Sequence, residues 1–279
     1  MGSTLLGGLL LINACQPDPP LPVERLTVGV VTYHEGEQTL ERYERFIQYL
    51  SQQTQTIVEL EPVYNELQAL ERIQQQSWSI VFAPASLAAI AIDQSQYAPL
   101  LPLDNQGTLY SLIVVRQDSN LSELSSLQNT VLALGEKGSA AGYYFPLYDL
   151  YGLTFAEIRF APTPKTALEW LSQGTVDAAA LAEDQYDTHR SAITQTPLTI
   201  LHRSRPIPNG VVLLGPTIDR NQEELIRKVF QQATSDLTND VGYLPNGTLP
   251  DYSHLLELIE KVQPLETRLQ DTPAILTKE

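Results

Sequence analysis

The chain has 279 residues, of which 43% are hydrophobic, and its formal net charge is -16 from 33 acidic and 17 basic residues. This length predicts roughly two domains, each able to bury a sizeable core. The acidic excess argues against nucleic acid as a partner, because phosphate backbones require clustered Lys and Arg, and against adsorption on an anionic membrane surface.

The N-terminal segment is expected to lie outside the fold. An apolar run at residues 5–12 is too short to span a bilayer and fits the central region of a signal peptide. The stretch Leu11–Cys15 resembles the lipobox of bacterial lipoproteins, so residues 1–15 are predicted to be a signal peptide that ends at a lipidated cysteine. Residues 16–25 then form a Pro-rich tether. The alternative is an ordinary buried N-terminal segment.

Cys15 is the only cysteine of the chain, so no disulfide can form within it. An anchor followed by a tether predicts a periplasmic or extracytoplasmic protein that contacts the membrane only through its lipid.

From residue 26 onward, strand patterns alternate with helical patterns. Short continuous apolar runs predict strands, and apolar residues recurring every three or four positions predict helices. The first half is expected to hold strands at Leu26–Val31, Ile57–Leu60, Ser79–Phe82 and Tyr110–Val115, and helices at Glu37–Gln53, Glu66–Gln75 and Ser86–Ile92. The second half is expected to hold strands at Thr130–Leu134, Glu157–Phe160, Val176–Leu181 and Val211–Leu214, helices at Tyr144–Tyr151, Lys165–Gln173, Asn221–Leu237 and Tyr252–Val262, and a frayed end at Thr272–Glu279.

This alternation predicts an α/β fold of two lobes, each a mostly parallel sheet flanked by helices, with a cleft between them. The expected boundaries are 26–108 for the first part of lobe 1, 109–204 for lobe 2, 205–270 for the return to lobe 1 with the C-terminal helices, and 271–279 for a tail. Ligands in such sheets bind beyond the carboxyl ends of the strands, so the loops at those ends are the candidate site.

One of these loops, Gly135–Tyr143, joins a predicted strand to a predicted helix through small residues. Such a turn leaves backbone N–H groups unpaired at the helix N-terminus, where the partial positive charge favours an anion. Small side chains at Ala140, Ala141 and Gly142 would let an anion approach the backbone, and Ser139 adds a hydroxyl donor. The alternative is a tight connection without a ligand.

Side chains for catalysis or metal binding are not grouped in the sequence. None of the four histidines (His34, His189, His202 and His254) has the spacing that places two metal ligands on one helical face. No nucleophile elbow and no phosphate-binding loop occurs either. We therefore expect neither an enzyme nor a metal or cofactor site. Glu183 stands in a strand-end loop, although solvated surface charge is the simpler interpretation.

Aromatic residues also gather at predicted strand ends. Tyr33, Phe82, Tyr110 and Tyr143 could wall a small ligand with an apolar face and a hydroxyl. Each alone could equally belong to the core. Ser86 opens a short helix, where it either caps the helix or donates to an anion.

Five segments together resemble the phosphate, phosphite and phosphonate substrate-binding proteins of ABC transporters. The five segments are Val28–Tyr33, Leu40–Phe46, Val81–Ser86, Gly138–Pro146 and Val176–Ala180. The resemblance covers roughly residues 26–214. Its most specific motif is the Gly-Ser-x-x-Gly-Tyr stretch. The resemblance implies a type II periplasmic-binding fold, with two crossing hinge strands, a ligand clamped at the hinge and a permease as partner.

The resemblance also implies roles for particular residues. Tyr33, Phe82 with Ala83, and Tyr110 would line the pocket from the first lobe and the hinge, while Ser139, Ala140 and Ala141 would present N–H groups to the anion.

The chain departs from the family pattern at three places. Ala140 and Ala141 stand where phosphonate-binding members often have Ser or Thr, and Pro164, with Lys165 beside it, takes the place of a histidine that often contacts the anion. The stretch around Asn209 lacks the acidic residue of aminophosphonate binders, which disfavours a charged amine.

The sequence thus predicts a monomeric, lipid-anchored solute-binding protein of an ABC transporter that captures a phosphonate, phosphite or phosphate-like oxyanion. The alternative is a two-lobed sensory or solute-binding module for a sulfonate-like or uncharged ligand. The ligand-binding residues would include Ser86, Ser139, Gly142 and Tyr143, with Lys165, Glu183 and Asn209 as further candidates.

Overall fold

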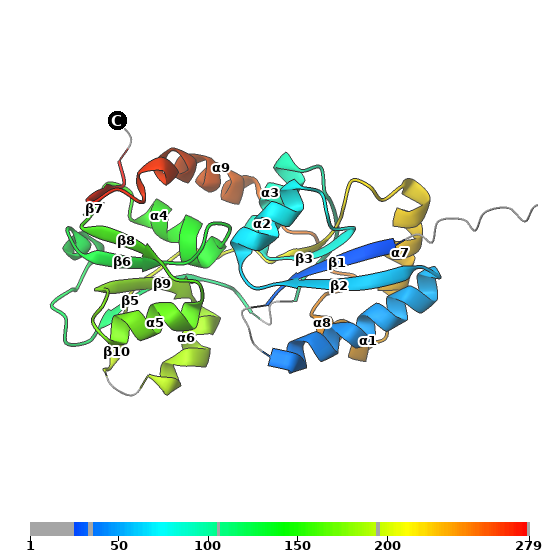
Figure 1. The fold of residues 1–279 in the computed structure, drawn as a ribbon, viewed down its shortest axis with the longest axis horizontal. Coiled ribbons are helices and arrows are strands. Elements are labelled where there is room, and N and C mark those ends of the chain that lie inside the picture. Colours follow the sequence, from blue (N-terminus) through cyan, green and yellow to red (C-terminus); the bar gives the residue numbers. More distant parts are fainter. Residues whose placement is uncertain (1–24, 33–35, 105–106, 194–195, 278–279) are drawn as a thin grey trace, which may run out of the picture.

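The computed structural model describes residues 25–32, 36–104, 107–193 and 196–277, without side chains at 36–40. Two five-stranded sheets with flanking helices lie side by side along the long axis (Figure 1). The chain leaves the first lobe after β4, builds the second, and returns with β11 to the first sheet. The predicted signal peptide with Cys15, the predicted tether up to residue 24, and Tyr33 lie outside the described residues.

The sheet of lobe 1 has the strand order β2-β1-β3-β11-β4. β1 pairs in parallel with β2 and β3, whereas β11 runs antiparallel to both β3 and β4. The strands are β1 (Arg25–Val31), β2 (Ile57–Val63), β3 (Ile80–Ala83), β4 (Ala98–Pro102) and β11 (Val211–Leu214). The parallel strands are connected by helices, as βαβ geometry requires.

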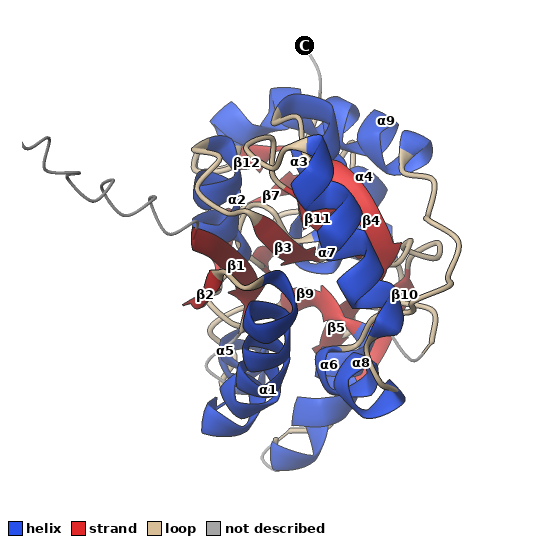
Figure 2. Ribbon diagram, turned by 90° about the vertical axis from the view of Figure 1, so that its right-hand side faces the viewer, coloured by secondary structure: helices blue, strands red, loops and turns tan. Residues whose placement is uncertain are grey.

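The helices of lobe 1 cover both faces of this sheet (Figure 2). They are α1 (Gly36–Thr54), α2 (Glu66–Gln74), α3 (Ala85–Gln94), α7 (Arg220–Gln232) and α8 (Ser235–Val241). Successive residues of a strand point to opposite faces, so Phe82 packs with Phe46 and Phe230 under α1 and α7, whereas Val81 joins the core under α2 and α3.

The sheet of lobe 2 has the order β10-β5-β9-β6-β8, with β6 parallel to β8 and β9, and β5 antiparallel to β9 and β10. Its strands are β5 (Ser111–Arg116), β6 (Val131–Leu134), β8 (Glu157–Phe160), β9 (Ala178–Ala182) and β10 (Leu198–Arg203). Its helices are η1 (Leu124–Leu127), η2 (Ala140–Tyr144), α4 (Phe145–Asp149), α5 (Pro164–Ser172), α6 (Glu183–His189) and η3 (Arg190–Ala192).

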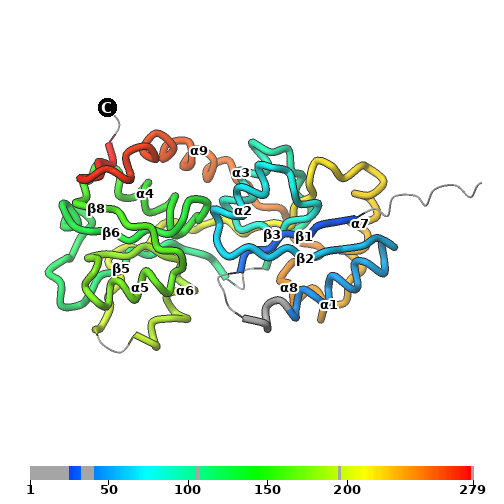
Figure 3. Tube along the Cα trace, viewed as in Figure 1, coloured from blue at the N-terminus to red at the C-terminus, as the bar shows by residue number. Residues whose placement is uncertain are grey.

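Two chain segments that are bonded to each other cross between the lobes (Figure 3). Leu109 and Ile207 form an antiparallel bridge in which the Ile207 N–H donates to the Leu109 carbonyl oxygen at 2.8 Å. Next to it, the Ser111 N–H donates to Ser204 Oγ at 2.9 Å. These bonds fix the two crossings as one hinge.

The C-terminal region straps both lobes together. Helix α9 (Ser253–Val262) packs on α3 of lobe 1 and on α4 and η2 of lobe 2, and η4 (Gln263–Arg268) follows it (Figure 1). The expectation of a frayed end is wrong for part of the tail, because β12 (Ala274–Ile275) pairs with β7 (Thr154–Phe155) and Leu276 is fully buried.

Other differences from the expected elements are local. The helix expected at Asn221–Leu237 is two helices, because Ala233 is extended (φ -61, ψ 143) and Thr234 starts α8. Strands β4 and β10, which are both edge strands, and the two-residue strands β7 and β12 were not predicted. Within the described residues, no helix is both long and apolar enough to cross a membrane.

Candidate functional site

The loop after β6 folds into a tight turn that leads directly into a helix. The Gly135 N–H donates to the Gly142 carbonyl oxygen at 2.8 Å, and Ser139 is the N-cap. The helix begins at Ala140, not at Tyr144 as expected, because a wide π-turn precedes α4: the Tyr144 N–H donates to the Ser139 carbonyl oxygen at 3.1 Å.

The first N–H groups of this helix are free to bind a ligand. Ser139 Oγ accepts from the Gly142 N–H at 3.1 Å, whereas the N–H groups of Ala140 and Ala141 donate to no acceptor among the residues that the structure describes. The Ser139 hydroxyl proton is likewise unused by those residues. Three donors therefore converge at the start of η2.

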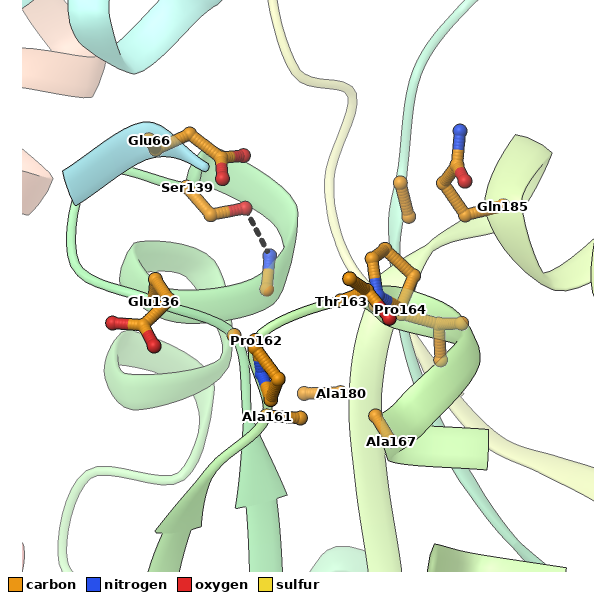
Figure 4. A pocket seen from close by; sticks show the side chains of 14 residues that line it. Glu66, Glu136, Ser139, Ala161, Pro162, Thr163, Pro164, Ala167, Ala180 and Gln185 are labelled. Atoms are coloured by element: carbon orange, nitrogen blue, oxygen red, sulfur yellow. Dashed lines mark hydrogen bonds between the residues drawn. The ribbon is translucent and has the colours of Figure 1, made fainter. Parts of the chain in front are cut away.

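Of these donors, Ser139 lines a small cavity of about 40 Å³ that both lobes border, and Ala140 and Ala141 follow it directly in the chain (Figure 4). A single water needs about 10–15 Å³, so the cavity suits a ligand of a few heavy atoms. Its lining combines the turn with the starts of two helices of lobe 2 and one residue of lobe 1: Glu66, Gly135, Glu136, Ser139, Gly142, Ala161, Pro162, Thr163, Pro164, Ala167, Ala180, Leu181, Ala182 and Gln185.

A second helix N-terminus meets the same cavity. Thr163 caps α5, its Oγ1 accepting from the Thr166 N–H at 3.1 Å, and Pro164 occupies the first helical position, where its missing N–H has no cost. The partial positive charge of α5 thus adds to that of η2.

The two lobes touch at the turn itself. Gly138 has a φ of +107°, and a β-carbon there would lie 2.8 Å from Cβ of Glu66 on α2. The buried Ser86 hydroxyl of lobe 1 donates to the Gly138 carbonyl oxygen. On the inner side of the turn, Ser111 Oγ donates to the Ala141 carbonyl oxygen at 2.5 Å. Bonds from lobe 1 and from the hinge therefore hold the turn in place.

A wider inter-lobe cavity of about 350 Å³ lies along the hinge. It is lined by Pro84, Ala85, Leu103 and Gly210 of lobe 1, residues 107–109 of the hinge, and Glu183, Asp184 and Asp187 of α6. Residues at the carboxyl ends of β3, β6, β8 and β9 thus line one of the two cavities, as expected for α/β sheets.

The turn residues that were expected to bind the ligand differ in whether they line the small cavity. Ser139 and Gly142 line the small cavity, while the methyl groups of Ala140 and Ala141 are buried at 6% and 4% exposure. Tyr143 packs against Tyr144 and Phe160 on the other side of the turn, where the charge of Glu266 and, above all, burial raise its pKa.

Phe82 and Tyr110, two of the aromatic residues expected to contact the ligand, do not line the small cavity. Phe82 lies in the aromatic core of lobe 1, with Tyr43 and Phe46 at ring distances of 5.2 and 6.0 Å, and Ala83 is fully buried in β3. The Tyr110 ring is covered by the Arg203 guanidinium at 3.5 Å.

The three further candidates are engaged in protein contacts. Glu183 lines the wider cavity and accepts a 2.6 Å bond from Arg203. Asn209 Nδ2 donates to the Leu103 carbonyl oxygen at 3.2 Å. Lys165 lies 3.9 Å from Glu169 on the exposed side of α5.

Sequence reasoning missed Glu66, Thr163 and Gln185. Glu66 is 5% exposed and lines the cavity as the first residue of α2, directly after the loop that follows β2. The amide oxygen of Gln185 is buried and accepts no hydrogen bond from the described residues. Glu136 also lines the cavity, but its side chain points away from Thr163 and Gln185, and burial raises its pKa (Figure 4).

Metal ligands do not cluster in this region or elsewhere in the described part of the chain. The histidine of β10, His202, forms a 2.8 Å bond to Asp149 away from either cavity.

Two five-stranded α/β sheets joined by a double crossing define a type II periplasmic binding protein, which confirms the predicted fold. A Xanthomonas citri protein solved with chloride has a TM-score of 0.72 at 20% identity, covering 87% of this chain and 99% of its own. PhnD1 of Prochlorococcus marinus in complex with methylphosphonate has a TM-score of 0.71 at 17% identity, covering 87% and 99%. A binding protein of an ABC phosphonate transporter from Pseudomonas aeruginosa has a TM-score of 0.68 at 18% identity, covering 89% and 88%. No curated protein sequence matches the chain.

The family model for the periplasmic substrate-binding protein of ABC phosphonate transporters matches residues 28–267. The chain belongs to this family, and the resemblance found in its motifs is confirmed. It is therefore a solute-binding protein of the transport class, with a small ligand and a permease as the partners that the family implies and an extracytoplasmic place of action.

Proposed function

We propose that this protein captures a small oxyanion, either a phosphonate, phosphite or phosphate, between its lobes and delivers it to an ABC permease. The observation that carries the proposal is the start of η2, where Ser139 lines a cavity between the lobes and the N–H groups of Ala140 and Ala141, next in the chain, donate to no acceptor among the described residues. The methylphosphonate complex of a protein with the same fold supports the choice of ligand class.

Binding would rest on backbone donors and helix dipoles. Among the described residues, those that line the cavity include neither Lys nor Arg. Hydrogen bonds to a charged acceptor contribute about 1.5–3 kcal/mol each, so three donors supply roughly 4.5–9 kcal/mol, a range that includes the roughly 8 kcal/mol of a micromolar Kd. The cation-free lining is consistent with a protein of net charge -16, in which the anion must be held locally.

Titration with methylphosphonate, phosphite, phosphate and sulfate, followed by calorimetry and by the melting temperature, tests the proposal. Saturation with a ligand should raise the melting temperature, because the ligand binds only the folded state. Absence of heat and of stabilisation with every oxyanion at millimolar concentration would rule the function out.

Ser139→Ala gives the residue-level test. It removes one ligand donor and one helix cap, so the affinity should fall by about tenfold. Asp219→Ala is the matched control, because Asp219 caps α7 away from both cavities, its Oδ1 accepting from the Asn221 and Gln222 N–H groups. The control should lose about 1 kcal/mol of stability and no affinity.

A sulfonate-like or uncharged ligand, with or without a sensory role, is the second candidate. It is favoured by the missing hydroxyls at Ala140 and Ala141, since both positions present only buried methyl groups. Binding of methanesulfonate at least as tightly as methylphosphonate would favour it over the first candidate.

We further propose that Cys15 carries a lipid that holds the protein at the outer side of a cytoplasmic membrane. The lipobox-like sequence before it supports this. Wild-type protein expressed in a bacterium should fractionate with membranes, and Cys15→Ala should be released. Equal distribution of the two would contradict the anchor.

A further inference from the structure

The side chain of Gln185 has a buried amide oxygen without a hydrogen bond. Gln185 belongs to α6 and lines the small cavity between the lobes. Its Oε1 atom is buried and accepts no hydrogen bond from any residue that the structure describes. Among those residues the Trp78 indole nitrogen is in the same state, but Trp78 lies in the hydrophobic core. A buried acceptor without a donor lowers stability, so its presence at a cavity points to a donor on the ligand.

The start of α6 places Gln185 at this cavity. α6 follows β9 directly, and Ala182, which joins the two elements, also lines the cavity. On either side of Gln185 the chain is held by lobe 2 itself: the Gln185 N–H donates to Asp184 Oδ1 at 2.8 Å, and Tyr186 is buried in the core of that lobe. Figure 4 shows Gln185 across the cavity from Ser139. The amide and the donor turn therefore face the ligand from two sides.

The hydroxyl groups that line the cavity are engaged away from Gln185. Thr163 Oγ1 accepts from the Thr166 N–H at 3.1 Å and shares a 2.9 Å hydrogen bond with the Thr166 hydroxyl. Ser139 Oγ accepts from the Gly142 N–H at 3.1 Å on the opposite side. Among the described residues, these side chains supply Gln185 Oε1 with no donor, whereas a ligand between the lobes can supply one.

We infer that Gln185 is a ligand-binding residue whose amide oxygen accepts a hydrogen bond from a hydroxyl group of the ligand. The cavity of about 40 Å³ has room for a few heavy atoms, so this hydroxyl lies close to the oxyanion. It is either a P–OH group or an O–H on the first carbon of the substituent, and both are neutral donors of the same chemistry. This inference rests on the proposed function of the same cavity.

The first test compares four small ligands on the wild-type protein by calorimetry. Methylphosphonate, methanesulfonate, hydroxymethylphosphonate and hydroxymethanesulfonate combine a P–OH group and a C–OH group in every way, because a phosphonate keeps one proton at about pH 5.5 and a sulfonate keeps none. Ligands whose hydroxyl reaches Gln185 should bind about tenfold more tightly than methanesulfonate, which has no hydroxyl.

The pattern among the four ligands identifies the source of the hydroxyl. A P–OH donor favours both phosphonates over both sulfonates, whereas a C–OH donor favours both hydroxymethyl ligands over both methyl ligands. Equal affinity for all four ligands would overturn the inference and leave the proposed function in place.

The second test is Gln185→Met, which removes the amide while nearly preserving the length of the side chain. The variant should lose the tenfold preference for hydroxyl-bearing ligands, and its affinity for methanesulfonate should stay that of the wild type. Gln231→Met, at an exposed position of α7, is the matched control and should keep the preference. A preference that persists in Gln185→Met would refute the role of Gln185.

The third test measures stability without any ligand. Gln185→Met should raise the melting temperature of the free protein by a few degrees, because the variant no longer buries an unpaired oxygen. Gln231→Met should leave the melting temperature unchanged. A lower melting temperature for Gln185→Met would mean that the amide stabilises the free protein, which contradicts the inference.

Two further outcomes separate the inference from the proposed function. If Gln185→Met weakens all four ligands equally, the amide N–H donates to the anion instead, and only the inference is overturned. If the wild-type protein binds none of the oxyanions, the proposed function fails and the inference fails with it.

Discussion

The hydroxyl of Ser86, on the first lobe, donates a hydrogen bond to the carbonyl oxygen of Gly138, on the second. Ser86 is fully buried at the start of α3, and Gly138 lies one residue before the N-cap of η2. The contact that joins the lobes is therefore made by the same turn that presents the N–H donors. Closure of the lobes and the geometry of the donors are coupled through this bond.

Ser86→Ala tests that coupling. The variant leaves the Gly138 carbonyl oxygen without its donor in the closed form, which should cost about 1 kcal/mol and raise the Kd for methylphosphonate by about fivefold. Ser51→Ala is the control, because the Ser51 hydroxyl donates to the Thr56 carbonyl oxygen at 2.6 Å within lobe 1 alone. Calorimetry that finds the same Kd for both variants would contradict a role of Ser86 in closure.

Gly138→Ala should impair both folding and binding. Its positive φ disfavours a side chain, and the new Cβ would meet Cβ of Glu66 at 2.8 Å across the lobe contact. Gly152→Ala provides the comparison, because Gly152 has a φ of +100° but nothing within 4 Å of its Cβ position.

Both glycine variants should lose about 1–2 kcal/mol of unfolding free energy from backbone strain. Only Gly138→Ala should also lose about tenfold or more in ligand affinity, because its Cβ pushes the lobes apart. Denaturant unfolding and calorimetry measure the two effects, and equal affinities of the two variants would show that the lobe contact does not matter.

Glu266 of η4 anchors the back of the turn. It forms a 2.6 Å ion pair with Lys137, and it lies near Tyr143, whose pKa is raised by burial and by this carboxylate. Glu266→Gln should lower the unfolding free energy by about 1–2 kcal/mol and the melting temperature by a few degrees.

The same variant should also lower the pKa of the Tyr143 phenol, because the nearby negative charge is gone. Alkaline titration of the phenolate absorbance follows this, with Glu260→Gln on the exposed side of α9 as the control. A Tyr143 titration that does not move would exclude the electrostatic contact.

Tyr97 should make the protein less stable in alkali. Burial raises its pKa from 10.0 to about 12, although the 3.1 Å bond from its hydroxyl to the Trp78 carbonyl oxygen is present. Between these two values the unfolded chain releases the proton while the folded protein keeps it, so the stability falls as pH rises. Below about pH 10 the group has no pH-dependent effect.

Tyr97→Phe should therefore reduce the fall in the urea midpoint between about pH 9.5 and pH 11.5, at a small constant cost for the lost hydrogen bond. Tyr151→Phe, at a residue of 50% exposure, should retain the wild-type slope. Identical slopes for all three proteins would exclude Tyr97 as the source.

The two longer strands that sequence patterns missed are both irregular. β4 and β10 both lie at sheet edges, where a strand buries less surface and tolerates irregularity. β4 contains Pro99 and Pro102, and β10 has a register shift between Ile200 and His202 and is mostly exposed. The central strands are continuous apolar runs because both of their faces are covered, and all of these were predicted.

The amino-acid sequence by itself determined the α/β order, the family and the location of the donor turn, because unpaired N–H groups after a strand are a local property of strand, small-residue turn and helix. The tertiary structure decided what faces those donors. The face on which Phe82 lies follows from the register of β3, and the approach of Glu66 and Gln185 follows from the angle at which the hinge joins the lobes. Such contacts depend on packing between elements far apart in the chain, to which no local pattern is sensitive.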